Sequence, residues 1–262
     1  MWVRLGLSHP RLATAKGLLV GSLFRPLTAL TARFGGVSMD ALMSARHQGI
    51  DAVLTEAIES GRVSQVIEIA AGLSGRGWRF MQKYPHQLRY IETDLPHMAA
   101  EKRRLLARIG RMPRGHRVVD LDALALEGPQ SLAAVAKMLD PKRGTAIITE
   151  GLINYFDFEH VQGLWARIAE ALDRFPKGVY ISDLYLTREN QGAIVNAFGR
   201  LLSAFVRGRM HIHFSKEAQA IAAAKAAGFR SAGVHVATKL PLPDRRHLGP
   251  GAERVRVLEA RS

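Results

Sequence analysis

Apolar residues are grouped along the chain in short runs that alternate with longer amphipathic stretches. A near-continuous apolar run indicates a strand buried on both faces, and apolar residues three and four positions apart indicate a helix. Runs of the first kind lie at residues 63–69, 89–93, 116–119, 145–149 and 178–183. Helical stretches separate them, as parallel strands require. The pattern therefore predicts an α/β fold with a mostly parallel sheet and helices on both faces.

The regions on either side of these strands have different patterns. Residues 1–62 predict an N-terminal helical segment, and residues 191–214 predict an inserted amphipathic helix that is a candidate lid. Asp157 and Ser215 are each placed to cap the helix that follows. Two late runs, at 232–237 and 255–260, are joined by a loop rich in proline and glycine. Without a helix between them, these last strands are expected to form an antiparallel pair at one edge of the sheet.

The first strand ends in a turn rich in glycine. The turn comprises residues 70–75, Ala-Ala-Gly-Leu-Ser-Gly, and the second strand ends at Asp94. Glycine lets the backbone approach a ligand closely, and a carboxylate about 20 residues further on can accept hydrogen bonds from ribose hydroxyls. The G-x-G-x-x-G pattern of dinucleotide sites lacks its first glycine here, and no Walker-type phosphate loop occurs. The turn thus indicates a nucleoside cradle of another kind.

Composition narrows the class of protein. The 262 residues, 47% of them hydrophobic, can fill the core of one large domain. The chain has no cysteine, which excludes disulfides, thiolate zinc sites and cysteine nucleophiles and fits a cytoplasmic location. His211 and His213 form a His-x-His pair, but no further ligand has a supporting spacing, so we expect no metal site.

The formal charge of +14 favours an acidic partner, which could be an anionic substrate, nucleic acid or a lipid surface. Near the N-terminus, the apolar run 16–24 is interrupted by Arg25 and Pro26, well short of the ~20 residues that a membrane span requires. We expect a helix that docks on the domain, with an interfacial membrane anchor as the weaker alternative.

Three motifs taken together resemble the leucine carboxyl methyltransferase family. They are residues 68–77 around the glycine turn, residues 90–106 around Asp94, and residues 149–155, Thr-Glu-Gly-Leu-Ile-Asn-Tyr. The likeness is greater to the bacterial branch, which includes methyltransferases of polyketide pathways, and covers roughly residues 46–184. It implies a Rossmann-like, class I S-adenosylmethionine-dependent methyltransferase fold, with a seven-stranded sheet whose last strand is antiparallel.

The resemblance also implies roles for particular residues. The family pattern assigns Arg46 to the methionine carboxylate, Gly72 to the wall beside methionine and ribose, and Asp94 to the ribose hydroxyls. It further assigns Asp120 and Leu121 to the adenine, and Glu150 to the cofactor or substrate side of the cleft. We add Glu68 to the cofactor site, with a contact to a buried water or backbone amide as the alternative.

Each of these side chains also has an alternative structural role. Arg46 could instead pair with Asp51 or another acid, Asp94 could cap the next helix, and Glu150 could be a structural acceptor. The family turn often reads Gly-x-Gly-Leu-Asp-x-Arg. Here Ala70 replaces the first glycine and Ser74 the aspartate, while Arg76 is kept.

The resemblance implies a single domain over residues 1–262. It would consist of an N-terminal helical cover (1–62), a cofactor-binding core (63–184), and a lid helix with the C-terminal strands (185–262).

The expected reaction is methyl transfer to an oxygen of a small acidic or aromatic molecule, which would be polyketide-like. A carboxylate acceptor is already ionised at neutral pH, whereas a phenol or alcohol must lose a proton. We place Tyr155, His211 and His213 at the substrate, with His97 as a further candidate base, and assign no catalytic residue.

Two other functions stay open at this stage. Nucleic-acid methylation would suit the positive charge, but the Pro-Pro-aromatic motif that commonly stacks on an extruded base is absent after the fourth strand. A protein that keeps the cradle without catalysis, as a scaffold, would suit the altered turn. The sequence leaves the methyl acceptor and the oligomeric state open.

Overall fold

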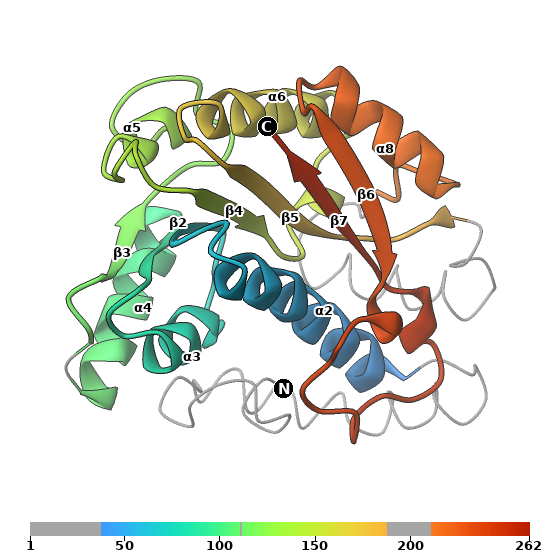
Figure 1. The fold of residues 1–262 in the computed structure, drawn as a ribbon, viewed down its shortest axis with the longest axis horizontal. Helices are drawn as coiled ribbons and strands as arrows, with labels where there is room; N and C mark the ends of the chain where they lie inside the picture. The colour runs from blue at the N-terminus through green and yellow to red at the C-terminus, as the bar shows by residue number, and fades with distance from the viewer. Residues whose placement is uncertain (1–37, 111, 188–210) are drawn as a thin grey trace.

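The computed structural model describes residues 38–110, 112–187 and 211–262 of the chain, and their strands form one seven-stranded sheet (Figure 1). The strand order is β3-β2-β1-β4-β5-β7-β6. The strands are β1 (Gln65–Ile69), β2 (Arg89–Asp94), β3 (His116–Asp120), β4 (Thr145–Thr149), β5 (Gly178–Leu184), β6 (Ser231–Val236) and β7 (Arg256–Arg261).

Strands β1 to β5 pair in parallel, as the spacing of the apolar runs predicts. Strand β7 lies between β5 and β6 and is antiparallel to both. The expected sheet, mostly parallel with an antiparallel last strand, is therefore confirmed.

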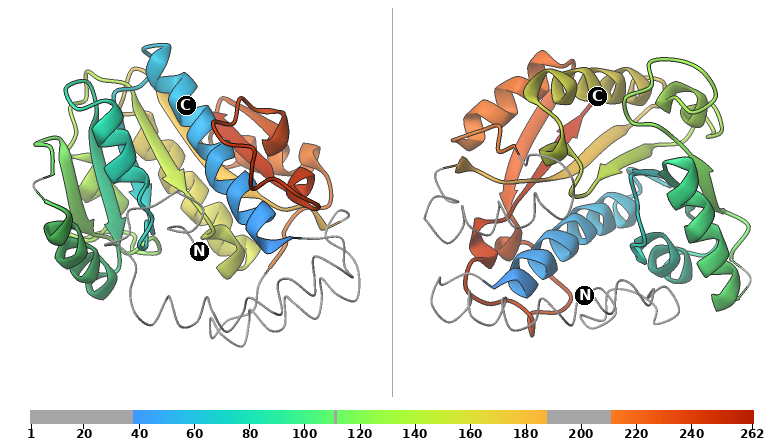
Figure 2. Two further views of the ribbon diagram at one scale, coloured as in Figure 1. Left: turned by 90° about the horizontal axis from the view of Figure 1, so that it is seen from below. Right: turned by 180° about the vertical axis from the view of Figure 1, so that it is seen from behind.

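The helices of the described part of the chain cover both faces of the sheet. They are α2 (Met39–Glu59), α3 (Arg76–Lys83), α4 (Pro96–Ile109), α5 (Leu132–Ala136), α6 (Phe158–Leu172) and α8 (Glu217–Ala226), with the short 3₁₀ helices η2 (Ile153–Tyr155), η4 (Ala237–Lys239) and η5 (Ala252–Arg254). Helices α2 and α3 pack on one face, and α5, α6 and α8 on the other (Figure 2).

Alternate residues of the central strands supply the two hydrophobic cores. In β4, Ile147 joins the core beneath α5 and α6, whereas Ile148 joins the core beneath α2 and α3. In β1, Ile67 and Val66 divide in the same way. Because side chains alternate between faces and both faces are buried, these strands appear in the sequence as continuous apolar runs.

Several local predictions can be compared with the structure. Asp157 caps α6 as predicted, accepting a hydrogen bond from the His160 amide. The predicted cap at Ser215 is wrong: α8 begins at Glu217 after Lys216, and the Gln219 side chain accepts hydrogen bonds from the Ser215 amide and hydroxyl.

The two segments that surround the core are described only in part. The predicted N-terminal helical segment is confirmed for α2, and residues 1–37 lie outside the described residues. Most of the predicted lid, residues 188–210, also lies outside them. Its last residues, 211–214, are extended, because Phe214 forms a bridge with Leu186, so the prediction of helix is wrong there.

A buried charged cluster joins α4 to the sheet. The ammonium of Lys102, whose side chain is 1% exposed, lies 2.7 Å from Glu92 Oε1 and donates to the Ala71 carbonyl at 3.3 Å. The second oxygen of Glu92 lies 2.8 Å from His116 Nε2. Burial alone would raise the pKa of Glu92, yet Lys102 and His116 hold it below its ordinary value. Lys102 thus supports the turn after β1 from beneath.

Replacing Lys102 with methionine should lower the free energy of unfolding by about 3–5 kcal/mol, because it leaves the Glu92 carboxylate buried beside an apolar side chain. The deficit should shrink as the pH falls, because without Lys102 the variant can protonate Glu92 at a pH at which the wild type, whose Glu92 pKa is lowered, keeps the carboxylate charged. Arg104→Met is the matched control: Arg104 lies on the same helix, is half exposed and pairs with Glu101, so its loss should cost under ~1 kcal/mol. Urea titrations that find equal losses would contradict the assignment.

Candidate active site at the carboxyl edge of the sheet

Four parallel strands bring the predicted site residues to one edge of the sheet. The register places Asp94 of β2 opposite Asp120 of β3, and Ile69 of β1 opposite Thr149 of β4. The glycine turn, Leu121 and Glu150 each follow directly after one of these strand ends. Residues up to 104 positions apart in the sequence therefore meet where ligands of open α/β sheets bind.

The glycine turn and the end of β2 are held together by a hydrogen bond. The Gly72 amide donates to Asp94 Oδ2 at 2.7 Å, and the Leu95 amide donates to Asp94 Oδ1 at 2.8 Å. Gly72 has a φ of +50°, and no atom lies within 4 Å of where its Cβ would be. The turn thus presents bare backbone to open space beside a half-buried carboxylate.

Ala70 has an unusual backbone conformation. Among the described non-glycine residues it alone has a positive φ, of 53°, and it stands where the family pattern has glycine. A left-handed conformation costs an L-residue roughly 1–2 kcal/mol. The turn is therefore kept in the glycine-type conformation although the glycine is absent.

Asp120 and Leu121 lie beside Asp94. The Leu121 amide donates to the Asp94 carbonyl at 2.8 Å, and the Leu121 side chain is buried. The Asp120 carboxylate pairs with Arg103 of α4 at 2.9 Å and is 36% exposed. Asp120 thus lies at the expected strand end, and a base seated there would meet a carboxylate that already has a cationic partner.

Arg46 and Glu150 also meet, and they bind each other. Arg46 Nε donates to Glu150 Oε1 at 3.0 Å, and Glu150 Oε2 is bonded to His47 Nδ1 at 2.9 Å and to Arg76 Nη2. Burial alone would raise the pKa of Glu150, but His47, Arg76 and Arg46 hold it well below its ordinary value. Glu150 therefore carries a negative charge that orients Arg46.

Arg76 is the centre of a larger buried ion cluster. Its guanidinium is fully buried, and it contacts Asp51 Oδ1 at 2.6 Å, Glu68 Oε1 and Glu150. Tyr90 donates its hydroxyl to the other oxygen of Glu68 at 2.7 Å. Glu68, 1% exposed, thus lies beneath the edge and supports Arg76, with a guanidinium and a phenol as its partners. The alternative role of Arg46, pairing with Asp51 or another acid, is wrong for Asp51, which pairs with Arg76 and Arg79, and confirmed for another acid, Glu150.

Asp183 is a site residue that the sequence reasoning missed. It ends β5, and its Oδ1 accepts a hydrogen bond from the Gly151 amide at 2.7 Å. Its Oδ2 is buried without a hydrogen bond, 3.8 Å from Arg46 Nη1, and burial raises the pKa of this carboxyl. Asp183 could have been predicted in the same way as Asp94, because an acidic residue at the carboxyl end of a parallel strand indicates a ligand-binding position. Arg46 therefore lies between two acids.

The three residues predicted at the substrate lie next to one another. Tyr155 ends η2, directly after the Glu150 turn, and is 42% exposed. The His211 amide donates to the Asn154 carbonyl at 2.8 Å, and the ring of His213 bonds to the Ile153 carbonyl. The rings of His211 and His213 are parallel, with centroids 6.0 Å apart. The structure thus brings this group to the β4 side of the same edge.

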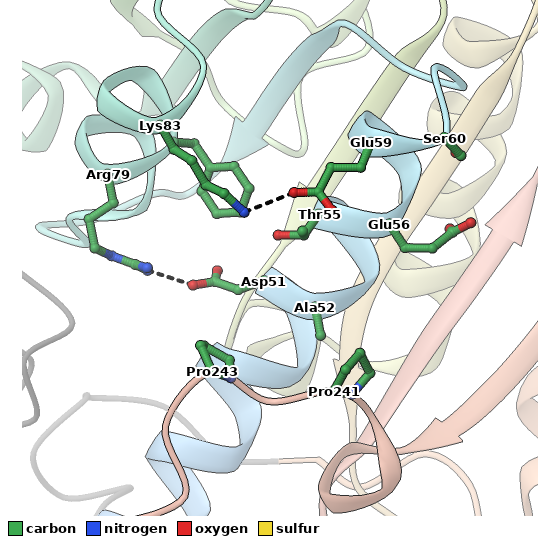
Figure 3. A pocket seen from close by; sticks show the side chains of 11 residues that line it. Asp51, Ala52, Thr55, Glu56, Glu59, Ser60, Arg79, Lys83, Pro241 and Pro243 are labelled. Atoms are coloured by element: carbon green, nitrogen blue, oxygen red, sulfur yellow. Dashed lines mark hydrogen bonds and ion pairs between the residues drawn. The ribbon is translucent and has the colours of Figure 1, made fainter.

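A cavity of about 720 Å³ lies elsewhere, between α2, α3 and residues 241–243 (Figure 3). Two ion pairs lie along it, Arg79 with Asp51 at 2.7 Å and Lys83 with Glu59 at 3.0 Å. None of the predicted cofactor residues lines it. Its wall reaches the ion cluster through Asp51, but its charges are already paired.

The residues at the carboxyl edge fit S-adenosylmethionine. A guanidinium suits its carboxylate, and an aspartate that accepts from two backbone amides still has lone pairs for a ribose diol. A Cβ on Gly72 would project into the open space beside the turn, and the φ of +50° favours glycine there. In the described part of the chain no three metal-ligating side chains cluster, and no helix is both long and apolar enough to span a membrane.

Comparisons with solved structures show a methyltransferase fold. A DUF574 family protein from Streptomyces avermitilis superposes with a TM-score of 0.63 at 15% identity, covering 89% of this chain and 88% of that one. Human N-acetylserotonin methyltransferase, solved with S-adenosylmethionine, superposes with a TM-score of 0.53 at 13% identity, covering 82% and 52%. At these identities the likenesses show the fold that this chain shares with methyltransferases.

The sequence comparisons give the family. The model for leucine carboxyl methyltransferase matches residues 24–169, more than half of the chain, and the chain belongs to that family. A protein of Mycobacterium leprae, provisionally named as an S-adenosyl-L-methionine-dependent methyltransferase, is 31% identical over 140 residues, 52% of this chain and 45% of its own. The chain spans about half the length of the curated relatives it matches. The expected family is thereby confirmed.

Replacing Ala70 with glycine should stabilise the protein by about 0.5–1 kcal/mol, because relief of the left-handed strain exceeds the entropy that glycine loses on folding. Ala71→Gly is the control. Ala71 is buried and has no positive φ, so its replacement should destabilise by about 1 kcal/mol. Thermal and urea unfolding measure both, and a loss of stability in Ala70→Gly would refute strain at this turn.

Proposed function

We propose that the chain transfers a methyl group from S-adenosylmethionine to an oxygen of a small-molecule acceptor. The observation that carries the proposal is the pairing of two fixed groups on one edge: Asp94, bonded to the Gly72 amide, and Arg46, bonded to Glu150. One can receive the sugar and the other the amino-acid tail of the same ligand. The bound cofactor would supply an activated methyl group on a sulfonium.

The residues of the chain would mainly bind and orient. Asp94 would accept hydrogen bonds from the ribose, Asp120 and Leu121 would border the adenine, and Arg46 would form a charge-assisted pair with the carboxylate. Glu150 would hold Arg46 in place from behind. Methyl transfer depends mostly on alignment, and fixing two reactants at attack distance can lower a barrier by ~7–11 kcal/mol.

A small acceptor is favoured over nucleic acid by the residues that follow β4. The turn there is Gly-Leu-Ile-Asn-Tyr, residues 151–155, with Ile153 and Asn154 buried and Tyr155 exposed. It offers one exposed ring and no proline-aromatic platform for an extruded base. We further propose one domain with the three parts expected from the sequence, in the cytoplasm.

Asp94→Ala should weaken the binding of S-adenosylmethionine by about 10- to 100-fold, the loss expected when a carboxylate no longer accepts from a diol. Asp173→Ala is the matched control. Asp173 is a half-exposed aspartate that follows the last residue of α6, and it is not one of the residues at the carboxyl edge of the sheet. Isothermal titration calorimetry measures both constants. Equal affinity of Asp94→Ala and wild type for S-adenosylmethionine would contradict the assignment of Asp94 to the ribose.

Methylation itself is tested with cofactor labelled on the methyl carbon and a panel of small carboxylic acids and phenols. We expect labelled ester or ether from at least one member, and at least a tenfold loss of rate in Arg46→Met, which cannot pair with the cofactor's carboxylate. Tight cofactor binding with no labelled product from any acid or phenol would favour the scaffold function. A gel shift on DNA or RNA that weakens steeply with salt would favour a nucleic-acid substrate.

A further inference from the structure

The exposed large apolar side chains of the described residues gather at the carboxyl edge. Leu95, Leu124 and Leu126 lie in the loops after β2 and β3, Tyr155 ends η2, Phe158 begins α6, and Ile212 lies in the segment bonded to Asn154. Exposed apolar groups concentrated around one site mark a binding surface. Tyr155 and Phe158 lie on its β4 side, where the Phe158 ring is next to the ring of His213, and they suit a flat apolar molecule.

The segment that carries the histidines is fixed at two points. Asn154 donates its side-chain amide to the His211 carbonyl at 2.6 Å and accepts from the His211 amide at 2.8 Å. Further along, the Thr187 amide donates to the Phe214 carbonyl at 2.8 Å. Residues 211–214 are therefore held between the segments that follow β4 and β5, at the carboxyl edge of the sheet.

The ring of His213 has a defined tautomer. Its Nε2 lies 3.1 Å from the Ile153 carbonyl, and since a carbonyl can only accept, the proton is on Nε2. Nδ1 then carries a lone pair, and no described residue donates to it. Phe158 lies beside the ring, with centroids 6.1 Å apart. His213 is thus a fixed neutral imidazole with its basic nitrogen unused.

The charged and polar groups around His213 leave it neutral near pH 7. Burial lowers its pKa, and the neighbouring His211 lowers it further, while the Ile153 carbonyl and Asp157 act in the opposite direction without reversing the shift. A neutral imidazole can take up a proton, whereas an imidazolium cannot.

We propose that Nδ1 of His213 is the general base for an aromatic hydroxyl acceptor seated against Tyr155 and Phe158. This rests on the proposed function and names its substrate class as a phenol. The phenolic proton moves to Nδ1, and the oxygen bonds to the methyl carbon. The carbon–sulfur bond breaks with its electron pair kept by sulfur, which becomes a neutral thioether. The proton on the imidazolium then passes to water.

The first test needs no activity. Long-range ¹H–¹⁵N spectra of the full chain, with His213→Gln to assign the signals, report the tautomer and titration of this imidazole. We expect the Nε2–H tautomer and a midpoint below 6.5, the ordinary histidine value. An Nδ1–H tautomer, or a midpoint above 6.5, would overturn the proposal and leave the proposed methyl transfer intact.

The second test compares 2-naphthol with 2-naphthoic acid, which share a ring system but differ in the need for a base. His213→Gln keeps an amide N–H for the Ile153 carbonyl and lacks a basic nitrogen. It should lower kcat/KM for naphthol by about 100-fold or more and change that for naphthoate less than about threefold. His235→Gln, on the edge strand β6, is the control and should leave both unchanged.

The outcomes separate the two levels of the account. Equal losses on both acceptors, or no loss on either, would overturn the role of His213. Methylation of naphthoate alone by wild type would overturn the phenol class. If neither is methylated while calorimetry shows cofactor binding, the phenol proposal also fails, and loss of cofactor binding in wild type would instead remove the proposed function.

Discussion

The buried guanidinium of Arg76 is the constraint on which the rest of the site depends. It joins Asp51 of α2, Glu68 of β1 and Glu150 after β4, three carboxylates from parts of the chain that are far apart in sequence. Leaving any of these acids buried without a partner would be costly, so each fixes the position of the others. The cluster therefore sets where α2 crosses the sheet and where the turn after β4 can lie.

Glu150 connects the buried cluster to the ligand-binding edge, because it pairs with both Arg76 and Arg46. Arg46 is the next cation outward, and its 15% exposed side chain is oriented by Glu150 and Asp183. Arg46, Arg76 and Arg79 face four carboxylates, those of Asp51, Glu68, Glu150 and Asp183, so the cluster has no excess of positive charge. The formal +14 of the chain therefore says little about the ligand, whose recognition depends on individual fixed groups.

What the sequence predicted follows from local pattern. The bounds of β4 were predicted correctly. Ile147 and Ile148 pack in the cores on opposite faces of the sheet, so the strand appears in the sequence as an unbroken apolar run. Gly72 and Asp94 were found because a tight turn and a strand-end carboxylate have recognisable spacing. The contacts of Glu68 with Arg76 and Tyr90 were missed. These residues are 8 and 22 positions away from Glu68, and contacts at such separations follow no helix or strand periodicity in the sequence. The Ser215 cap failed because the Ser215 hydroxyl donates to the Gln219 side chain instead of accepting a hydrogen bond from a helix amide.

The central claim is that adenosine binds beside Gly72, with its sugar at Asp94 and the amino-acid tail of the cofactor at Arg46. A crystal structure of the full chain with S-adenosylhomocysteine tests this most directly. We expect ribose hydroxyls within hydrogen-bond distance of Asp94 and the ligand carboxylate paired with Arg46. A ligand bound instead in the cavity between α2 and α3, or away from both side chains, would contradict it.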